Sequence, residues 1–275
     1  MPNLSFSKLK QKKIRLSASY GKRRLFYFLT ALIASLLVLA GTFLDESLGL
    51  HVVATFVKLG LAWLAFMLAR QSGYLDPAGD GRLFTPYFLL ILPPVLLNVL
   101  CYLGPVQAGD KLRLMLLTLA GVAATAFWEE LFFRLWGRIL FEEDGKYRPL
   151  DFLFLVLTFG VMHLINLIVS PFGAVAVQAM LAVVTALFLQ TIYTCSGSLR
   201  LIILFHFLIN ASSILLGRFL VPDAESLFFP ALEGIAPLLF GAYYALSAAI
   251  LARRRNLFGS RGSLISRKIR ELRKH

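Results

Sequence analysis

The sequence predicts an all-α protein that crosses a membrane about eight times. Of its 275 residues, 58% are hydrophobic and the mean hydropathy is +0.75, whereas soluble domains are roughly 45–50% apolar. Apolar runs of about 20 residues, long enough for a helix to span a bilayer, recur along nearly the whole chain. No internal repeat, low-complexity tract or long linker separates these runs, so we expect one polytopic membrane domain over residues 26–252.

The expected spans follow one another with short connections. They lie near residues 26–44, 51–69, 84–103, 112–140, 150–170, 173–195, 198–216 and 230–252. The first run has about 19 apolar residues, longer than the apolar core of a typical secretory signal peptide, so we expect a retained helix. Pro93 and Pro94 interrupt the third span.

The positive charge is concentrated at the two ends of the chain. Residues 1–24 hold eight Lys/Arg and no acid, and residues 253–275 hold nine Lys/Arg and one acid. An even number of spans places both ends on the same side of the membrane. With both ends in the cytoplasm, 23 of the 28 Lys/Arg fall on the cytoplasmic side and three in outer loops. Enrichment of Lys/Arg in cytoplasmic segments is the usual orientation signal, so we expect both termini to be cytoplasmic.

This distribution also explains the net charge of +13 without nucleic acid. We expect residues 1–25 to form a basic cytoplasmic segment and residues 253–275 to form a basic amphipathic tail. In that tail, Ile265, Ile269 and Leu272 share one helical face among basic residues, a pattern typical of helices that lie on anionic lipid. We therefore predict an integral protein of a prokaryotic plasma membrane, with anionic lipid at its basic termini.

Three ionisable residues interrupt the apolar fourth span. The stretch FWEELFFRLW, residues 127–136, contains Glu129, Glu130 and Arg134, although an ionised group in a bilayer costs roughly 2.5–3.5 kcal/mol by insertion scales. Glu130 and Arg134 have the i, i+4 spacing with the acid first, which favours an ion pair. Glu129 is displaced by about 100° on a helix, so we expect it to point elsewhere and to need another partner. A purely structural ion pair with one spare acid near the headgroups explains these residues equally well when they are considered alone.

Two later spans also carry polar residues. His163 follows Phe159 by one turn in the fifth span, and His206 precedes Asn210 by one turn in the seventh. A single intramembrane histidine or amide more often forms an interhelical hydrogen bond than a catalytic site. Depth favours a shared site, because Glu129, His163 and His206 lie about eleven, thirteen and eight residues from the inner ends of their spans. We therefore expect one buried polar site built from three helices.

This set of groups suits hydrolysis by an activated water. A carboxylate beside an imidazole can hold a water molecule and take its proton, while a second imidazole and an amide can donate hydrogen bonds to a developing oxyanion. No Ser or Cys lies at a matching depth with an evident base beside it, so a covalent acyl-enzyme is not favoured.

The three motifs resemble those of the CPBP family, the CAAX-protease and bacteriocin-processing (Abi) intramembrane endopeptidases that include the Rce1-type CAAX proteases. The matching positions are EExxxR at Glu129, Glu130 and Arg134, FxxxH at Phe159 and His163, and HxxxN at His206 and Asn210. They occur in the family's order, each on its own span, and the resemblance covers about residues 112–216.

The resemblance implies a glutamate-dependent intramembrane protease whose site opens toward the cytoplasm. Transferred by motif position, Glu129 is the general base and acts on a water together with His163. His206 and Asn210 form the oxyanion hole. The implied substrate is a membrane-associated protein or peptide, and the expected prokaryotic origin makes a prenylated substrate less expected.

The remaining motif residues have supporting roles in this resemblance. Arg134 pairs with Glu130, and Phe159 completes the second motif. Lys58 lies within the second span without an obvious partner, and we interpret it as a packing residue or one that extends along the lipid toward the membrane surface.

Three alternatives stay open from the sequence. A metalloprotease could use Glu129, His163 and His206 as a zinc site, although no HExxH spacing is present, so we expect no cofactor. A transporter also carries buried charges, but interrupted helices or inverted repeats are expected there. A non-catalytic scaffold or regulator of the same family need not keep every catalytic group, and this chain has them all.

Overall fold

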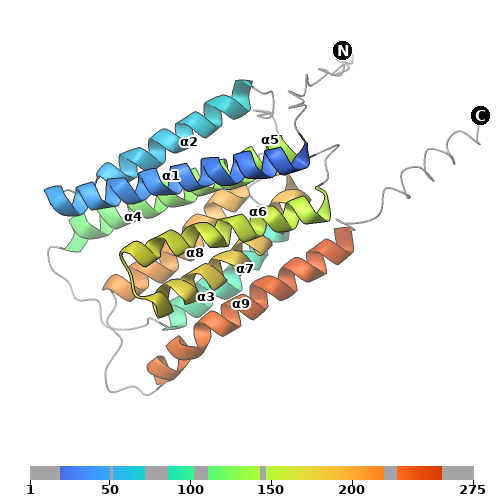
Figure 1. Ribbon diagram of the computed structural model, residues 1–275. Coiled ribbons are helices and arrows are strands. Elements are labelled where there is room, and N and C mark those ends of the chain that lie inside the picture. The colour runs from blue at the N-terminus through green and yellow to red at the C-terminus, as the bar shows by residue number, and fades with distance from the viewer. Residues whose placement is uncertain are drawn as a thin grey trace, which may run out of the picture.

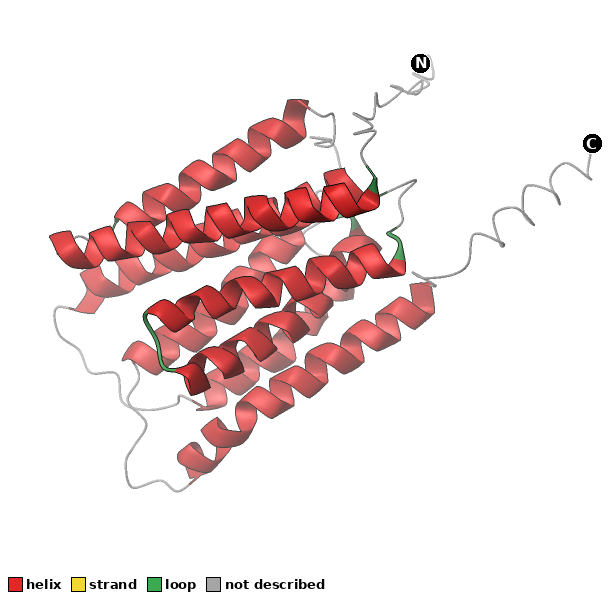
Figure 2. Cartoon of the chain, in the orientation of Figure 1, coloured by secondary structure: helices red, strands yellow, loops and turns green. Residues whose placement is uncertain are grey.

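The computed structural model describes residues 19–49, 52–71, 86–101, 111–142, 147–219 and 228–255. All regular structure in these ranges is helical (Figure 2). The elements are α1 (Tyr20–Leu48), α2 (Val53–Gln71), the 3₁₀ helix η1 (Pro86–Ile91), α3 (Leu92–Cys101), α4 (Lys111–Glu129), the π-helix η2 (Glu130–Trp136), α5 (Gly137–Phe141), α6 (Pro149–Met162), the 3₁₀ helix η3 (His163–Ile168), α7 (Phe172–Ser196), α8 (Leu199–Phe219) and α9 (Phe228–Arg255).

Each predicted span coincides with one helical passage, and the expected all-α membrane fold is confirmed. Six passages within the described ranges are long and apolar enough to cross a membrane. The other two contain shorter apolar helices, at Tyr87–Leu96 and Leu199–Ser213. Two passages continue through a change of helix type, from α4 through η2 to α5 and from α6 to η3.

The third passage shows how its two prolines are accommodated. It begins as η1 and becomes α3 at Leu92, immediately before Pro93 and Pro94. The first four N–H groups of a helix have no intrahelical partner, so proline loses nothing there that an interior position would require. The Pro-Pro pair therefore marks the start of α3 rather than a kink within it.

The helices form a bundle in which segments distant in sequence lie side by side. α2 packs against both α1 and α4, α7 packs against α6 and α9, and α4 contacts α8. α1 begins and α9 ends at the same end of the bundle (Figure 1). We call this end the basic end, because the basic terminal segments adjoin it in the sequence, and the opposite end the distal end.

Close helix contact depends on small residues. A Cβ added at Gly160 of α6 would lie 2.2 Å from Val183 Cγ2 of α7, and one added at Gly137 would lie 2.7 Å from a methyl group of Leu155. Small residues allow membrane helices to pack closely through van der Waals contacts. Gly160 in particular brings α6, which continues into η3 at His163, against α7.

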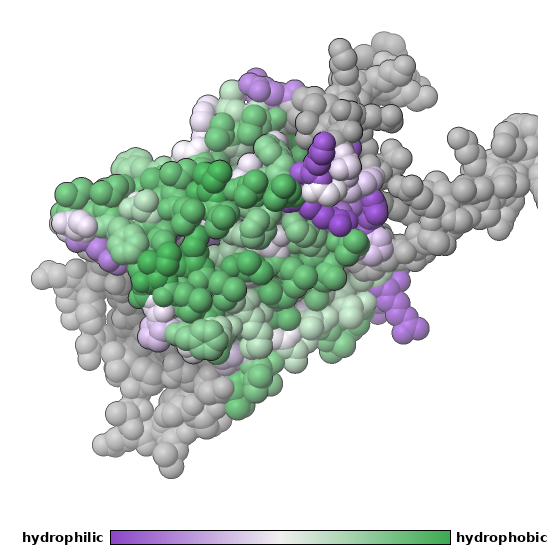
Figure 3. Space-filling model, in the orientation of Figure 1, coloured by the Kyte–Doolittle hydropathy of each residue, from purple (hydrophilic) through white to green (hydrophobic). Residues whose placement is uncertain are grey.

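The outer surface of the bundle is apolar across its middle (Figure 3). Large side chains such as Phe56, Trp63 and Leu238 are about two-thirds exposed, at 68%, 64% and 66%. Such a surface is expected where the solvent is lipid rather than water. The hydrophilic residues in this view gather mainly where α1 begins.

At the distal end, α1 and α2 are joined by a capped turn. Gly49 adopts the left-handed conformation, with φ of 63°, that ends α1. The buried Asp45 carboxylate accepts hydrogen bonds from the backbone N–H groups of Val52, Val53 and Ala54, at 2.9, 2.7 and 2.9 Å. It therefore caps the first turn of α2, whose free N–H groups and helix dipole favour a negative charge.

At the basic end, ion pairs join the helices. Arg24 of α1 donates to the fully buried Asp151 of α6 at 2.6 Å. Arg138 lies 2.6 Å from Glu142 and donates to the Tyr193 hydroxyl of α7 at 3.2 Å. The predicted lipid-binding segments lie largely outside the described residues, which begin at residue 19 and end at 255.

Candidate active site

The glutamate pair lies where α4 changes into a π-helix. Glu129 is the last residue of α4 and Glu130 the first of η2, which extends to Trp136. π-helical turns have i→i+5 hydrogen bonds and frequently occur at functional sites. Arg134 Nε lies 3.2 Å from Glu130 Oε2, so the predicted ion pair is present.

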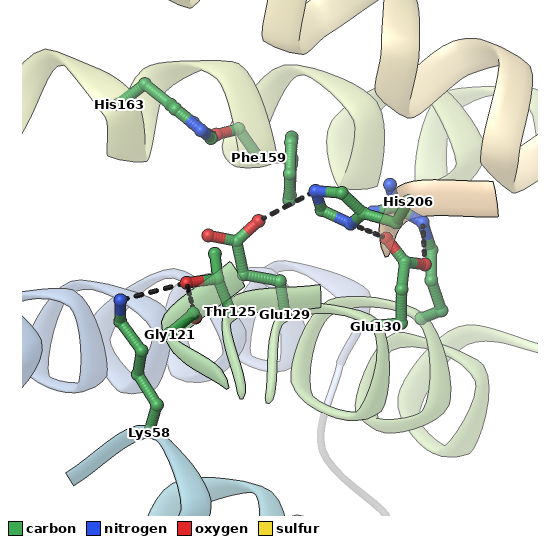
Figure 4. A network of polar contacts seen from close by, with 9 residues as sticks. Lys58, Gly121, Thr125, Glu129, Glu130, Phe159, His163 and His206 are labelled. Atoms are coloured by element: carbon green, nitrogen blue, oxygen red, sulfur yellow. Dashed lines mark hydrogen bonds and ion pairs between the residues drawn. The ribbon is translucent and has the colours of Figure 1, made fainter. Parts of the chain in front are cut away.

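His206 of α8 lies between the two glutamates (Figure 4). Its Nδ1 is 2.8 Å from Glu130 Oε1, and its Nε2 is 3.5 Å from Glu129 Oε2. Glu129 thus has a partner other than Arg134, and this partner is the imidazole that Glu130 also contacts. The imidazole lies between the two carboxylates and presents one nitrogen to each.

This arrangement constrains the protons of the site. Ionised carboxylates only accept hydrogen bonds, so the short contact to Glu130 places a proton on His206 Nδ1. A hydrogen bond along the longer contact then requires a second proton, either on His206 Nε2 or on Glu129. In the first case, a cationic His206 and Arg134 together balance the two carboxylates.

The two glutamates differ sharply in exposure. The Glu130 side chain is fully buried, as is Arg134 with 1% exposed, whereas the Glu129 side chain is 13% exposed and lines a cavity. A buried charge requires pairing and hydrogen bonds to offset the loss of water. Glu130 therefore belongs to a sealed ion cluster with Arg134 and His206, while Glu129 can meet water and substrate.

Phe159 connects the cationic side of this cluster to the second motif. Its ring centroid lies 4.8 Å from the Arg134 guanidinium carbon, close enough for a cation–π contact. The same ring lies 4.9 Å from the His163 ring and 6.2 Å from the His206 ring, measured between centroids. The aromatic residue of the FxxxH motif thus contacts all three.

His163 begins η3, immediately after α6 ends at Met162. Its Nδ1 lies 2.9 Å from the Phe159 carbonyl oxygen. Because a carbonyl can only accept, Nδ1 carries the proton, and Nε2 of a neutral His163 keeps its lone pair. The structure places His163 on the cavity that Glu129 lines but gives no direct contact between the two side chains.

Asn210 lies one turn after His206 on α8 and lines the same cavity. Its amide has no hydrogen-bonding partner among the described residues. The cavity has a volume of about 640 Å³, within the range of small-molecule and cofactor sites. It therefore brings all four predicted catalytic residues to one space.

Lys58 is a cavity residue that the sequence interpretation missed. It reaches from α2 into the cavity, and its Nζ donates to Thr125 Oγ1 at 2.9 Å. Thr125 lies one turn before Glu129 and donates in turn to the Gly121 carbonyl at 2.8 Å (Figure 4). The lipid-facing interpretation is therefore wrong, whereas the contact with Thr125 does join α2 to α4. The available signal was the charge itself, since an intramembrane lysine generally marks a functional site.

The donor atoms of the zinc alternative are distributed as follows. Nε2 of His206 faces Glu129, while Nδ1 of His206 faces Glu130 and Nδ1 of His163 faces the Phe159 carbonyl. Within the described ranges, no group of three His, Cys, Asp or Glu side chains is arranged to hold a metal ion.

Comparison with known families agrees with the motif assignment. Residues 111–212 match the family model described as Rce1-like, type II CAAX prenyl endopeptidase Rce1-like. This range contains all three motifs. Searches of curated proteins and of solved structures gave no match. The region of residues 111–212 is therefore similar to the Rce1-like, CPBP-type family of intramembrane proteases.

Proposed function

We propose that this protein is a metal-independent glutamic endopeptidase that cleaves a peptide bond of a membrane-associated protein or peptide. The observation that carries the proposal is the position of Glu129. Its carboxylate lies at the boundary between a sealed ion cluster and a cavity of about 640 Å³, which His163, His206 and Asn210 also line. A base in this position can reach both a water molecule and a substrate carbonyl.

In the first step, Glu129 takes a proton from a water molecule and the oxygen attacks the carbonyl carbon. His163 helps to hold this water, because its Nε2 can accept a hydrogen bond while Nδ1 donates to the Phe159 carbonyl. The carbonyl π bond breaks and its electron pair moves to the oxygen, giving a tetrahedral oxyanion. General base catalysis of this kind contributes about 10²–10⁴-fold to a rate.

In the second step, the oxyanion collapses and the C–N bond breaks. Glu129 returns its proton to the departing nitrogen, so that one water and one amide yield an acid and an amine. His206 and Asn210 lie one turn apart on α8 and supply donors to the oxyanion. For this role His206 carries a proton on Nε2, which the two neighbouring carboxylates stabilise.

The sealed residues hold this machinery in position. Glu130 accepts from His206 Nδ1 at 2.8 Å and thereby fixes the orientation of the ring. Arg134 balances the charge of Glu130, and its guanidinium rests on the Phe159 ring. Glu130 and Arg134 are positioning residues because they are buried behind the groups that line the cavity, and Phe159 is one because its ring separates Arg134 from the cavity.

The test is cleavage of a membrane-anchored substrate by purified protein in lipid vesicles. Glu129→Gln keeps the size and hydrogen-bonding capacity of the side chain but removes the base. We expect cleavage to fall by about 10²–10⁴-fold with unchanged expression and thermal stability. Glu46→Gln, the same chemical change at an exposed position near the end of α1, is the matched control and should retain full activity.

A chelator distinguishes the zinc alternative. Activity that disappears with chelator and returns with added zinc would contradict the metal-independent mechanism. Near-normal cleavage by Glu129→Gln would contradict the role of this residue as the base. If the protein is a scaffold, neither the wild type nor Glu129→Gln should cleave the substrate, and both should still bind the partner.

A further inference from the structure

The outer surface of the bundle carries a groove that is separate from the catalytic cavity. It has a volume of about 560 Å³, is formed by α2, α4 and α8, and shares no lining residue with that cavity. On α8 its lining begins at Arg200 and continues through Ile203, Leu204 and Phe207, the i, i+3, i+4, i+7 spacing of one helical face. On α4 the same spacing runs from Ala120 to Phe127. The groove therefore lies on faces of α4 and α8 other than those that present the catalytic groups.

The groove is hollow because its α4 side is made mostly of small residues. Three of the four α4 residues that line it are alanine, and apart from Thr55 and Arg200 the whole lining is apolar. Leu59 and Phe127 in this lining are 44% and 39% exposed, and the exposed middle of a membrane-spanning bundle faces lipid. The part of the chain that the structure describes places no side chain in this space. Its occupant is therefore an apolar chain from the bilayer.

The groove is long enough to hold one acyl chain. Its α8 part ends at Phe207, its α4 part runs from Ala120 to Phe127, and each covers seven residue steps. His206 contacts Glu130 at 2.8 Å, which sets Phe207 and Phe127 at a similar level, so the two parts follow one another along the bundle. At 1.5 Å per residue their combined length is about 20 Å. One leaflet contributes about half of a hydrocarbon core of about 30 Å, so the groove exceeds the depth of a leaflet.

Arg200 places a positive charge at one end of this groove. α7 runs toward the basic end, and α8 begins there after a turn of two residues (Figure 1). Arg200 lies in the first turn of α8, is exposed, and has no ion-pair partner among the described residues. An arginine in such a place lays its apolar stem along the protein and keeps its guanidinium at the membrane surface. The guanidinium binds phosphate through paired N–H groups, so the groove has a phosphate-binding group at headgroup level.

We propose that this groove binds an anionic phospholipid of the leaflet at the basic end, with its phosphate on Arg200 and one acyl chain along α8 and α4. Charge complementarity selects this occupant, because a lipid without net negative charge fills the groove but leaves the charge of Arg200 unbalanced. The site differs from the lipid contact expected at the basic termini, since Arg200 belongs to the helical bundle. It also goes beyond the proposed function, because neither Glu129 nor the catalytic cavity takes part.

Lipid titration of the purified full-length protein tests this site. Native mass spectrometry measures the affinities for phosphatidylglycerol, which is anionic, and phosphatidylcholine, which has no net charge, with the same acyl chains on both. The wild type should bind phosphatidylglycerol more tightly. Arg200→Gln should weaken phosphatidylglycerol binding by about fivefold, as expected for one cation at a membrane surface, and leave phosphatidylcholine binding unchanged. Arg70→Gln, the same change at an exposed position in the last turn of α2 and outside the groove, is the matched control.

A second variant tests the chain-binding part of the groove. Ala123→Leu fills the space at an exposed position of α4 and should weaken the binding of both lipids. Ala242→Leu, the same change at an exposed position of α9 outside the groove, should weaken neither. If one lipid uses both features, Arg200→Gln should cause little further loss in an Ala123→Leu background. Should Ala123→Leu fail to fold, Ala120→Leu is a second exposed position in the same groove.

Three results would overturn the inference. The first is equal affinity of the wild type for the two lipids. The second is an equal effect of Arg200→Gln and Arg70→Gln, which would indicate binding to surface charge in general. The third is undiminished binding by the groove-filling variant. The basic termini are present in every variant and no cleavage is measured, so neither their lipid contacts nor the proposed catalytic mechanism affects the comparison.

Discussion

Glu129 and Glu130 are neighbours in sequence but belong to two different environments. On the Glu130 side, toward the basic end, the side chains are buried and their charges pair with one another. On the Glu129 side, toward the distal end, polar and apolar side chains together line a cavity. Full pairing is necessary where a charge has no access to water. Because Glu129 is only partly paired, its carboxylate can still take part in a reaction.

The two environments should govern different properties of the protein, stability on the Glu130 side and activity on the Glu129 side. Residues behind His206 should affect folding first, because their charges depend on one another. Residues in front of it should affect turnover first, because they meet the substrate. Substitutions on each side of His206 therefore test whether stability and turnover can be changed separately.

The largest effect is expected from Arg134→Ala, on the sealed side. The substitution leaves Glu130 buried without its cation, and breaking a buried pair costs about 3–5 kcal/mol. We expect a much lower thermal midpoint and little folded protein, measured by fluorescence-detected size exclusion after heating. Normal stability would mean that Arg134 faces water or substrate. Arg148→Ala, at an exposed basic-end position, is the matched arginine control.

Asn210→Ala, on the open side, should have the opposite signature. One oxyanion donor contributes about 10²–10³-fold to turnover, so kcat should fall by that factor with little change in KM or thermal midpoint. Steady-state cleavage in vesicles measures both constants. A loss confined to KM would show instead that Asn210 binds the substrate before the transition state.

Gly160→Ala tests how closely α6 must approach α7. The added Cβ would lie 2.2 Å from Val183 Cγ2, and overpacking of this kind costs about 1–3 kcal/mol. Gly173→Ala, where a Cβ meets no atom within 4 Å, should leave the midpoint almost unchanged. Equal midpoints for the two variants would argue against close packing at Gly160.

Lys58→Met should have the smallest effect. It replaces a partly buried ammonium, bonded to the neutral Thr125 hydroxyl, with an apolar chain of similar length. Charges separated by a few ångströms near water interact by about 1 kcal/mol, so cleavage should fall by roughly tenfold or less and stability should not fall. A loss as large as that of Glu129→Gln would place Lys58 in the catalytic machinery.

The sequence was sufficient to predict the helices and the gathering of Glu129, His163, His206 and Asn210 around one space. Apolar length identifies each passage because a bilayer demands about 20 apolar residues, and the spacing of Glu130 and Arg134 was enough to predict their ion pair. The expected depths of Glu129 and His206 along spans of alternating direction also predicted that their side chains lie close together, and Glu129 Oε2 is 3.5 Å from His206 Nε2. These features could be predicted because they depend on the order and spacing of residues along the sequence.

The features that were missed depend on contacts between helices. The shared imidazole of His206 follows from the approach of α8 to η2, and the position of Lys58 follows from the packing of α2 on α4. The π-helix gives no separate apolar pattern over seven residues.

The π-helix has a consequence for how this segment tolerates changes in length. A π-helical turn accommodates one more residue than an α-helical turn, so η2 acts as a length reserve between α4 and α5. Deleting one residue within η2 would restore α-helical bonding with little rotation of the helix beyond it, because the π turns hold one residue more than α-helical turns of the same sweep. Phe141 would then keep its place against Tyr27, while a deletion between Glu130 and Arg134 would change their spacing from i, i+4 to i, i+3. A deletion in the α-helical turns of α4 would instead rotate everything beyond it by about 100°, so it should disrupt the site more than a deletion within η2.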